Sequence, residues 1–373
     1  MQNKDIIYML IPYKLIENIG CSMESDKKGY TSTEIQKIYR FSENEKTLTQ
    51  LYYAEETSSI PSSIRVNRGK VPVRYWSQDT LSKIGSKFGF LKQTKESHIF
   101  CVYFAKGGGN IKSSWAMNFL RTMAINGVSK KNGTGKILAI PLDTQQSLTD
   151  YLLGKPEIES LKDIKQTKGL YELLYENEPL ENIIRPTDLP NLFIIPESVS
   201  LSLLEKKIRF ETKREDFFNK RLLPLLKDFD YIVFDNSPSW SSLQECSLAC
   251  SDNVIAPVGL DFGGFNALSV NNENIREFQD AMGLSWDNYI IQPVMLQKTK
   301  LSAQILSSYM TQYPDEVIEV PIRASIIGQE SLVMKKSVIE HAPSSPLADD
   351  YYESIKLVWD KVLKAEALNV VEA

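Results

Sequence analysis

Histidine and cysteine are scarce in this sequence, which has two histidines and four cysteines among 373 residues. Four cysteines are too few for a disulfide-stapled scaffold, so we expect a reducing compartment. Two histidines argue against a metal site built from several imidazoles. No apolar run approaches the ~18–20 residues of a membrane-spanning helix, so we expect no membrane partner. The first twenty residues are interrupted by charged side chains and do not resemble a secretory signal, which makes a cytoplasmic localisation the expected one.

The charge is distributed unevenly along the chain, although its total is only −4. Residues 1–98 carry 15 basic and 11 acidic side chains, a net charge of +4, whereas residues 99–373 carry −8. The basic excess is concentrated in residues 60–98, where the net charge is +6. A basic segment ahead of an acidic body favours an anionic partner for the front of the chain, and nucleic acid is the expected one.

The length and the sequence pattern divide the chain into three parts, since a domain holds roughly 100–200 residues. Residues 1–22 place apolar side chains at near-helical spacing, which predicts an N-terminal helix. This helix either packs on its own domain or pairs with a second copy, and we assign it to dimerisation. Residues 23–97 are expected to form a DNA-binding domain, and residues 98–373 an α/β domain.

The segment after the first helix has the pattern of a winged helix-turn-helix. Thr31 or Ser32 can cap one helix and Ser42 can cap a second. Strands at 63–66 and 71–76, joined by a glycine-containing turn, predict a basic hairpin, and a short helix is expected at 81–91. A solvated hairpin without a ligand is the alternative. The side chains that would lie near DNA phosphates are Arg65, Arg68, Lys70 and Arg74.

From residue 98 onward, short apolar strands alternate with helical segments. This alternation predicts an α/β fold with a mostly parallel, doubly wound sheet that helices cover on both faces. Ligands bind beyond the carboxyl ends of the strands in such sheets. We expect strands at 98–105, 136–142, 192–196, 231–234, 254–257, 289–296 and 317–322, and helices at 112–126, 202–227, 241–250, 266–281 and 302–313.

A glycine-rich turn after the first strand gives the clearest chemical signal. It runs from Lys106 to Ser114 with the sequence KGGGNIKSS. Backbone N–H groups of a glycine turn and a helix N-terminus form a cradle for an anion, and Lys112 adds charge for the β- and γ-phosphates of a nucleotide. The Ser113 hydroxyl is suited to Mg²⁺. Because Ile111 precedes Lys112, the strict G-x₄-G-K-[ST] spacing is not met, and a plain glycine loop is the alternative.

Two strand ends add carboxylates to this site. Residues 230–235 read DYIVFD, an apolar strand that ends in Asp235, as a P-loop enzyme requires for its Mg²⁺ shell. Asp143 follows the strand at 136–142, where it could orient an attacking water. Each aspartate could instead cap a helix or lie in a loop. Together with the glycine turn, they predict an ATP or ADP site with Mg²⁺, the fold being that of a P-loop NTPase.

These motifs, in this order, resemble those of the ParA/MinD superfamily. KGGGNIKSS resembles its deviant Walker A motif, K-G-G-x-x-K-[ST]-[ST], and DYIVFDNSPS resembles its Walker B segment. ILAIPLDTQQSLTDYLLG and SDNVIAPVGLDFGG resemble two further family segments. With its N-terminal helix and helix-turn-helix, the chain is similar to the long ParA proteins of plasmid partition.

The resemblance implies a function and a set of partners. A weak Mg-dependent ATPase would form a homodimer, and the ATP-bound dimer would bind DNA without sequence preference and associate with the nucleoid. A ParB-type centromere-binding protein would stimulate hydrolysis, and the N-terminal domain would bind an operator and repress the operon. The alternative is a nucleotide-sensing transcriptional regulator with a degenerate P-loop and no role in segregation.

The resemblance also assigns roles by position. Asp143 matches the catalytic aspartate, and Lys106 matches the signature lysine that reaches the partner's phosphates across the dimer. Arg323 matches a DNA-contacting arginine of the ATPase domain. The implied Mg²⁺ ligands are Ser113 and Asp235. The implied nucleotide-binding residues are Lys106, Gly107, Gly108, Gly109, Asn110, Ile111, Lys112, Ser113 and Ser114.

The chain departs from the family pattern at three points. Five residues separate Lys106 from Lys112, where the family has four. Pro141 stands in place of the first aspartate of a D-x-D motif and therefore removes a carboxylate, and Thr144 stands in place of the following proline. Nucleotide binding is thus more strongly predicted than fast hydrolysis.

Other conspicuous side chains are expected to be structural. Cys246 and Cys250 lie four residues apart on an expected helix without another cysteine or a histidine nearby, which favours burial over metal binding. The tryptophans at 76, 115, 240 and 286 are expected to belong to the core.

Overall fold

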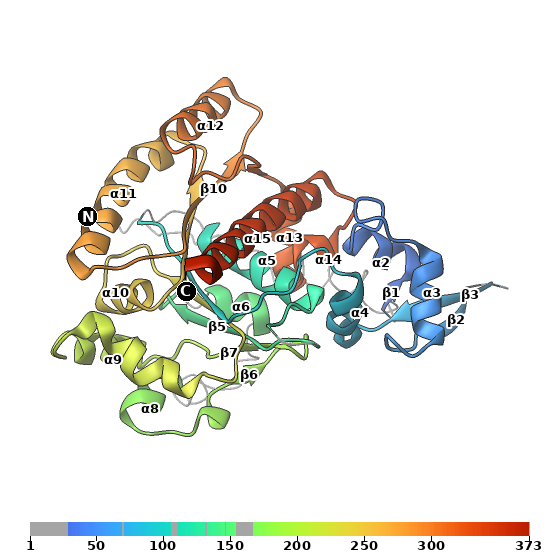
Figure 1. Ribbon diagram of the computed structural model, residues 1–373, viewed down its shortest axis with the longest axis horizontal. Coiled ribbons are helices and arrows are strands. Elements are labelled where there is room, and N and C mark those ends of the chain that lie inside the picture. Colours follow the sequence, from blue (N-terminus) through green and yellow to red (C-terminus); the bar gives the residue numbers. More distant parts are fainter. Residues whose placement is uncertain are drawn as a thin grey trace, which may run out of the picture.

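A computed structural model describes residues 29–68, 71–105, 111–130, 133–145, 147–153 and 167–372. The expected dimerisation helix at 1–22 lies outside these residues, as do residues 106–110 of the glycine turn and Lys70 of the hairpin. The described chain forms an α/β body with a smaller group of elements, α2 to α4 and β1 to β3, at one end (Figure 1).

The first described helix begins where the sequence predicts. α2 (Ser32–Ile38) starts after Thr31, whose hydroxyl accepts a hydrogen bond from the backbone N–H of Glu34. The Glu34 carboxylate accepts one in return from the N–H of Thr31, 2.8 Å away. This capping box satisfies two N–H groups at the helix start and confirms Thr31 as the cap.

The second helix begins later than the sequence predicts. α3 (Leu48–Glu56) has Thr47 as its N-cap, so the cap expected at Ser42 is wrong. The physical reason is that Glu45 adopts a left-handed φ of 54°, which a right-handed helix starting at Ser42 does not accommodate.

The expected hairpin is present. β2 (Ile64–Arg68) pairs antiparallel with β3 (Val71–Trp76), and the short β1 (Tyr30–Thr31) pairs with the other edge of β3. The hairpin points away from the body (Figure 1). A 3₁₀ turn, η1 (Gln78–Thr80), then leads into α4 (Leu81–Phe88), which confirms the short helix expected there. These elements have the order of a winged helix-turn-helix, and their role in DNA binding stays a prediction.

The body is built on an eight-stranded sheet of the described chain, with the order β11-β10-β9-β4-β8-β5-β7-β6. Its described pairings are parallel except the one between β6 and β7, which confirms the predicted mostly parallel sheet. The strands are β4 (His98–Val102), β5 (Ile137–Leu142), β6 (Arg185–Pro186), β7 (Leu192–Ile194), β8 (Tyr231–Asn236), β9 (Asn253–Gly259), β10 (Asn288–Leu296) and β11 (Ile322–Arg323).

Helices cover both faces of this sheet, because alternate strand residues point to opposite sides. On β5, Ile137 and Ala139 face a core shared with α5 and α15, whereas Leu138 and Ile140 face α8, α9 and α10. The helices are α5 (Ile111–Asn126), α6 (Ser147–Leu153), α8 (Leu170–Tyr175), α9 (Leu201–Ile208), α10 (Ser242–Ala249), α11 (Phe262–Met282), α12 (Lys300–Gln312), α13 (Ile326–Val333), α14 (Val338–His341) and α15 (Pro346–Glu372).

Two expected elements are shorter in the structure. The helix expected at 202–227 ends at Ile208. It is followed by the short helical turns η3 (Arg214–Asp216), η4 (Phe218–Leu222) and η5 (Leu223–Leu225), and a similar turn, η2 (Leu180–Asn182), lies earlier in the chain. Lys213 interrupts the helix with a left-handed φ of 52°. The strand expected at 317–322 is reduced to an isolated bridge at Val317 and to β11, because Pro321 has no N–H for the ladder.

The N-terminal elements pack directly on the body. One hydrophobic core continues from Ile35 and Ile84 to Ile125 and Trp359. Gly85 of α4 lies so close to the carbonyl oxygen of Ile125 that any Cβ would clash with it. The division into units at 23–97 and 98–373 stays a prediction.

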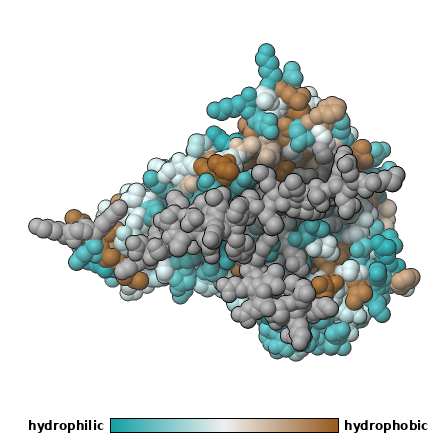
Figure 2. All heavy atoms as spheres, turned by 180° about the vertical axis from the view of Figure 1, so that it is seen from behind, coloured by the Kyte–Doolittle hydropathy of each residue, from teal (hydrophilic) through white to brown (hydrophobic). Residues whose placement is uncertain are grey.

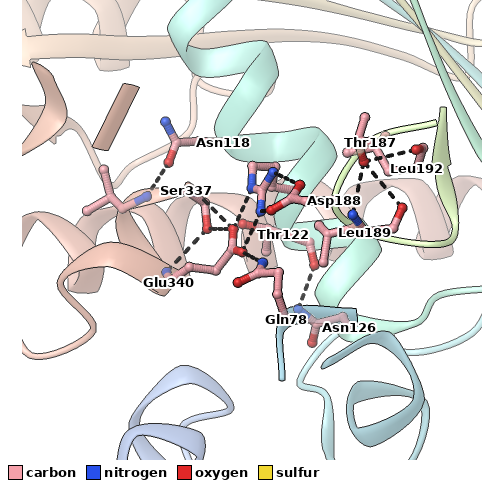
Figure 3. Close-up of polar contacts among 12 residues, drawn as sticks. Gln78, Asn118, Thr122, Asn126, Thr187, Asp188, Leu189, Leu192, Ser337 and Glu340 are labelled. Carbon is pink, nitrogen blue, oxygen red and sulfur yellow. Dashed lines mark hydrogen bonds and ion pairs between the residues drawn. The ribbon is translucent and has the colours of Figure 1, made fainter. Parts of the chain in front are cut away.

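A buried polar network joins the two groups of elements (Figure 3). The guanidinium of Arg121, on α5, donates to both carboxylate oxygens of Glu340 at 2.8 Å and to both of Asp188 at 2.7 and 2.9 Å. Glu340 also accepts from the side chains of Ser337 and Gln78, the latter in η1. Arg121 and Glu340 are fully buried, so the network fixes the N-terminal elements against the P-loop helix α5.

On the face in Figure 2, the described residues are mostly hydrophilic, and apolar side chains occur in small separate groups. None of the helices in the described ranges combines the length and the hydrophobicity of a membrane span.

Candidate functional site

The start of α5 brings a lysine and a serine to the carboxyl edge of the sheet. Lys112 and Ser113 lie in the first turn of α5, directly after the glycine turn, and both are buried. Burial lowers the pKa of the Lys112 ammonium, while the nearby carboxylates of Asp235 and Asp143 oppose this change. A helix N-terminus with a buried cation beside it is suited to bind an anion.

Asp235 lies near the end of β8, between β4 and β5. It is level with Val102 on β4 and with Pro141 on β5. The carboxylate is 1% exposed, and neither oxygen has a hydrogen-bond partner among the described residues. Burial raises its pKa to about 7, and the Ser113 hydroxyl and the Lys112 ammonium oppose the rise. A buried carboxylate without a donor is costly unless a cation is held there.

These residues fit Mg²⁺. The ion prefers hard oxygen ligands, and a serine hydroxyl beside an unpartnered carboxylate supplies two of them. Among the described residues, no group of three or more histidine, cysteine, aspartate or glutamate side chains has the arrangement of a metal site held by protein alone. Substrate phosphates and water would therefore complete the shell, as is usual for Mg²⁺ in nucleotide sites.

Asp143 follows β5 and lies beside the same space. Its Oδ1 accepts a hydrogen bond from the N–H of Gln145 at 3.1 Å, so the carboxylate orders its own loop. The side chain is half-buried and lines the cavity that Lys112 and Ser113 also line. The structure therefore brings Asp143, which follows β5, to the same cavity as Lys112 and Ser113 of α5.

The cavity has a volume of about 510 Å³, which is in the range of small-molecule sites. It is lined by the start of α5, the end of β5 and the loop at 237–241 that follows β8. Glu205 of α9 and Arg209, which follows this helix, also line it and form an ion pair of 2.6 Å. Lys106 and the other residues at 106–110 lie outside the described residues, and Ile111 and Ser114 begin α5.

Trp240 lies in this cavity wall and is a correction to the sequence analysis. The side chain is 39% exposed rather than buried, because its loop lies at the surface between β8 and α10. Its indole N–H donates to Glu245 at 3.0 Å, and its ring packs edge-on against Tyr103 and Phe278. Its position two residues after Pro238, in the loop beyond a strand-end aspartate, is the signal that could have placed it at the site.

The remaining tryptophans and the two cysteines of α10 and its end are buried or half-buried. Trp76 and Trp115 are buried, as expected, and Trp286 is half-buried with its N–H bonded to the carbonyl of Leu248. Cys246 and Cys250 are buried free thiols, which confirms their structural interpretation.

The expected DNA-contacting side chains have different surroundings. Arg65 is exposed on β2. Arg74 donates to Glu55 at 2.9 Å and stacks over the Tyr52 ring at 4.1 Å, so it is partly occupied within the chain. The side chain of Arg68 and all of Lys70 lie outside the described part.

Arg323 lies on β11, at the edge of the eight-stranded sheet, whereas the hairpin belongs to a separate three-stranded sheet. It makes a two-pronged ion pair with Asp350, with distances of 2.5 and 2.7 Å. Its charge is thus partly compensated inside the chain, and the structure does not bring it together with the basic residues of the hairpin.

Comparison with protein families and curated proteins gives consistent matches. The model of an AAA domain family matches residues 97–287, just over half of the chain. The cell division protein PomZ of Myxococcus xanthus is 25% identical over 290 residues, which cover 78% of this chain and 84% of PomZ. The sporulation initiation inhibitor protein Soj of Bacillus subtilis is 25% identical over 60% of this chain and 86% of Soj.

Solved structures share the fold. Apo McdA from Cyanothece superposes with a TM-score of 0.58 at 19% identity, covering 70% of this chain and 98% of McdA. A plasmid partition protein from Borrelia burgdorferi has a TM-score of 0.52 at 20% identity, covering 71% of this chain and 99% of its own. Because this family model spans just over half of its length, the chain belongs to the AAA domain family, and the relatives that it resembles include Soj and ParA proteins.

Proposed function

We propose that this protein is a partition ATPase that binds Mg·ATP in the cavity at the start of α5 and hydrolyses it slowly during DNA segregation. The observation that carries the proposal is the convergence of Lys112 and Ser113 with Asp235, a fully buried carboxylate whose oxygens have no partner among the described residues. The family and its relatives, which include chromosome partitioning protein ParA of Myxococcus xanthus, support the same role.

Each side chain has a distinct task in this proposal. Lys112 and the N–H groups at the start of α5 bind the β- and γ-phosphates and stabilise the charge that develops on them. Ser113 and Asp235 hold Mg²⁺, which neutralises phosphate charge when it is bound. Asp143 orients the attacking water. Lys106 is proposed to reach the phosphates of the partner subunit in a homodimer.

The test of the function is ATP hydrolysis measured alone, with DNA, and with DNA and the product of the neighbouring gene. Stimulation of hydrolysis by DNA and by the partner protein supports a cycle in which a ParB-type protein releases the homodimer from DNA. Nucleotide-dependent promoter binding without any stimulated hydrolysis would favour the alternative, a nucleotide-sensing transcriptional regulator. A cytoplasmic protein associated with the nucleoid, without a membrane partner, is the proposed setting.

Lys112→Ala is expected to weaken ATP binding by about 10- to 100-fold, since a hydrogen bond to a charged group contributes roughly 1.5–3 kcal/mol. Isothermal calorimetry with Mg²⁺ present measures the change. Lys227→Ala is the matched control, because Lys227 is an exposed lysine ahead of β8, at the other edge of the sheet. If the Lys112 variant binds ATP as tightly as the control does, the site is assigned to the wrong residues.

We also propose that the N-terminal elements bind operator DNA and repress the operon. The hairpin projects from the body, and the segment from 60 to 98 has a net charge of +6. α3 presents Thr49, Gln50 and Tyr53 to solvent, side chains that can reach base edges while the hairpin contacts phosphates. The proposed contacts are Arg65, Arg68, Lys70 and Arg74, and Arg323 is proposed to contact DNA only in the ATP-bound dimer.

Arg65→Ala is expected to weaken nucleotide-free binding to the protein's own promoter. Loss of one phosphate contact should reduce the slope of log K against log[salt] by about 0.9. Fluorescence anisotropy across a salt series gives that slope for the variant and for Arg185→Ala, an exposed arginine of β6. An unchanged slope for Arg65→Ala would remove this residue from the interface.

A further inference from the structure

Glu197 lies at the same sheet edge as the nucleotide site, although no motif marks it. It follows β7 by three residues, and the pairing of β7 with β5 continues through the N–H of Ile195, which donates to the carbonyl of Ala139 at 3.0 Å. β7, β5 and β8 are neighbours in the sheet. Glu197 therefore occupies the carboxyl end of the strand beside the one that Asp143 follows, and Asp235 ends the next strand.

Among the described residues, no cationic side chain forms an ion pair with the buried Glu197 carboxylate. Its side chain is 4% exposed, and Oε2 accepts a hydrogen bond from the Thr149 hydroxyl of α6. Oε1 has no hydrogen-bond partner among the described residues. Burial raises its pKa to about 8. Hydrogen bonds from Thr149 and from the backbone of Glu197 itself oppose the rise, and the neighbouring carboxylates of Asp235 and Asp143 add to it.

Other buried glutamates of the described chain show what a structural role looks like. Glu340 is paired with Arg121, and one oxygen of Glu366 accepts from the N–H groups of Lys95 and Glu96. Glu172 accepts the N–H of Gly169 in a capping box. Each of these carboxylates has a cationic donor or backbone N–H donors from other residues, whereas the side-chain donor to Glu197 is a neutral hydroxyl and Oε1 has no hydrogen-bond partner among the described residues.

A carboxylate in this position costs stability unless a cation comes to it. The carboxylates of Asp235 and Asp143 lie close enough to influence Glu197 electrostatically, and both also interact with the Lys112 ammonium. The position level with Asp235 on the intervening strand is Pro141, which supplies no charge. A divalent cation near Asp235 would relieve the repulsion among all three carboxylates at once.

We propose that Glu197 is a third carboxylate of the nucleotide site. Its charge stabilises bound Mg²⁺ from the β7 side, while Asp235 binds the ion from the β8 side. The inference rests on the proposed function, because the metal arrives with ATP. Glu197 acts as a positioning residue through the water shell of the ion, and Thr149 fixes the direction of its carboxylate. Because Thr149 lies in α6, the helix after the loop of Asp143, its hydrogen bond also connects that part of the chain to the Glu197 carboxylate.

The test compares ATP affinity with Mg²⁺ and with EDTA for wild type and Glu197→Gln, by calorimetry on the full chain. With Mg²⁺, the variant should bind ATP about 10- to 100-fold more weakly, the usual effect of losing an outer-shell group. With EDTA, it should bind ATP as well as wild type or more tightly, because one charge that repels the phosphates is gone. The melting temperature of the ligand-free variant should not fall.

Two more variants complete the test. Glu197→Asp keeps the charge and should restore part of the Mg²⁺ dependence. Glu366→Gln is the matched control, since Glu366 is a buried glutamate beside His98 at the amino end of β4, and both of its ATP affinities should equal those of wild type.

Two results would overturn the inference alone. One is a Glu197→Gln variant that loses ATP affinity equally with Mg²⁺ and with EDTA and melts at a lower temperature, as a structural residue would. The other is a Glu197→Gln variant that binds ATP as tightly as wild type with Mg²⁺ and with EDTA, in an experiment where Lys112→Ala still weakens ATP binding. A wild-type protein that does not bind Mg·ATP at all overturns the proposed function together with this inference.

Discussion

Asp143→Ala is expected to leave ATP affinity within a few-fold of wild type while stimulated turnover falls by ~10²–10⁴. The carboxylate lines the cavity beside Lys112 and Ser113, yet its one described hydrogen bond is to the N–H of Gln145 in its own loop. A group that orients water stabilises the transition state more than the bound ground state, so the rate should change and the affinity should not.

The measurement is steady-state ATP hydrolysis with DNA and the partner protein, alongside calorimetry of ATP binding. Asp228→Ala, an exposed aspartate ahead of β8, is the control and should match wild type in both. The variant should also stay on DNA longer, since release depends on hydrolysis in the proposed cycle. Equal, slow rates for wild type and Asp143→Ala under these conditions would mean that Pro141 and the longer glycine turn have already disabled hydrolysis.

The nucleotide site is predictable because its signals are local. Lys112 and Ser113 follow a glycine turn, and Asp235 ends a short run of apolar residues, rich in β-branched and aromatic side chains, which favours a buried strand. The order of strands in a parallel sheet then brings separate strand ends to one edge. Asp143 needed the same reasoning, and the structure places it at the same cavity.

Glu197 escaped prediction for a physical reason. A strand is expected at 192–196, directly before Glu197, but a glutamate that follows a proline in this way matches no motif of a nucleotide site. A glutamate before a serine reads as an exposed loop residue. The burial of Glu197 depends on α6 and on the neighbouring strands, which are far away in sequence. The exposure of Trp240 likewise depends on the surrounding loops, so the expectation that it belongs to the core was wrong.

The core around α15 was missed as well. The composition of this helix is ordinary, and no local sequence pattern indicates that Trp359 packs against Phe100 and Tyr231. These contacts lie in the core on the face of the sheet that α5 also covers. The same holds for the Arg121–Glu340 pair, whose members are 219 positions apart. An arginine on a helix is normally solvated, and only the assembled fold shows that this one is fully buried.

That pair supports the second large prediction, which concerns stability. Glu340→Leu is expected to lower the free energy of unfolding by about 3–5 kcal/mol, the usual cost of removing one partner from a buried ion pair. Arg121 would keep only Asp188, whose side chain is 42% exposed, and Gln78 and Ser337 would lose their acceptor. Urea denaturation followed by circular dichroism measures the loss.

Replacing both partners separates the charge from the shape. Arg121→Met combined with Glu340→Leu should be more stable than Glu340→Leu alone, because no charge is then left buried without its partner. The control pair is Arg209–Glu205, an i,i+4 pair with Arg209 58% exposed, where Glu205→Ala should change stability by less than about 1 kcal/mol. A double variant no more stable than Glu340→Leu would show that the network stabilises the fold through packing against η1 and α5, and not by compensating the Arg121 charge.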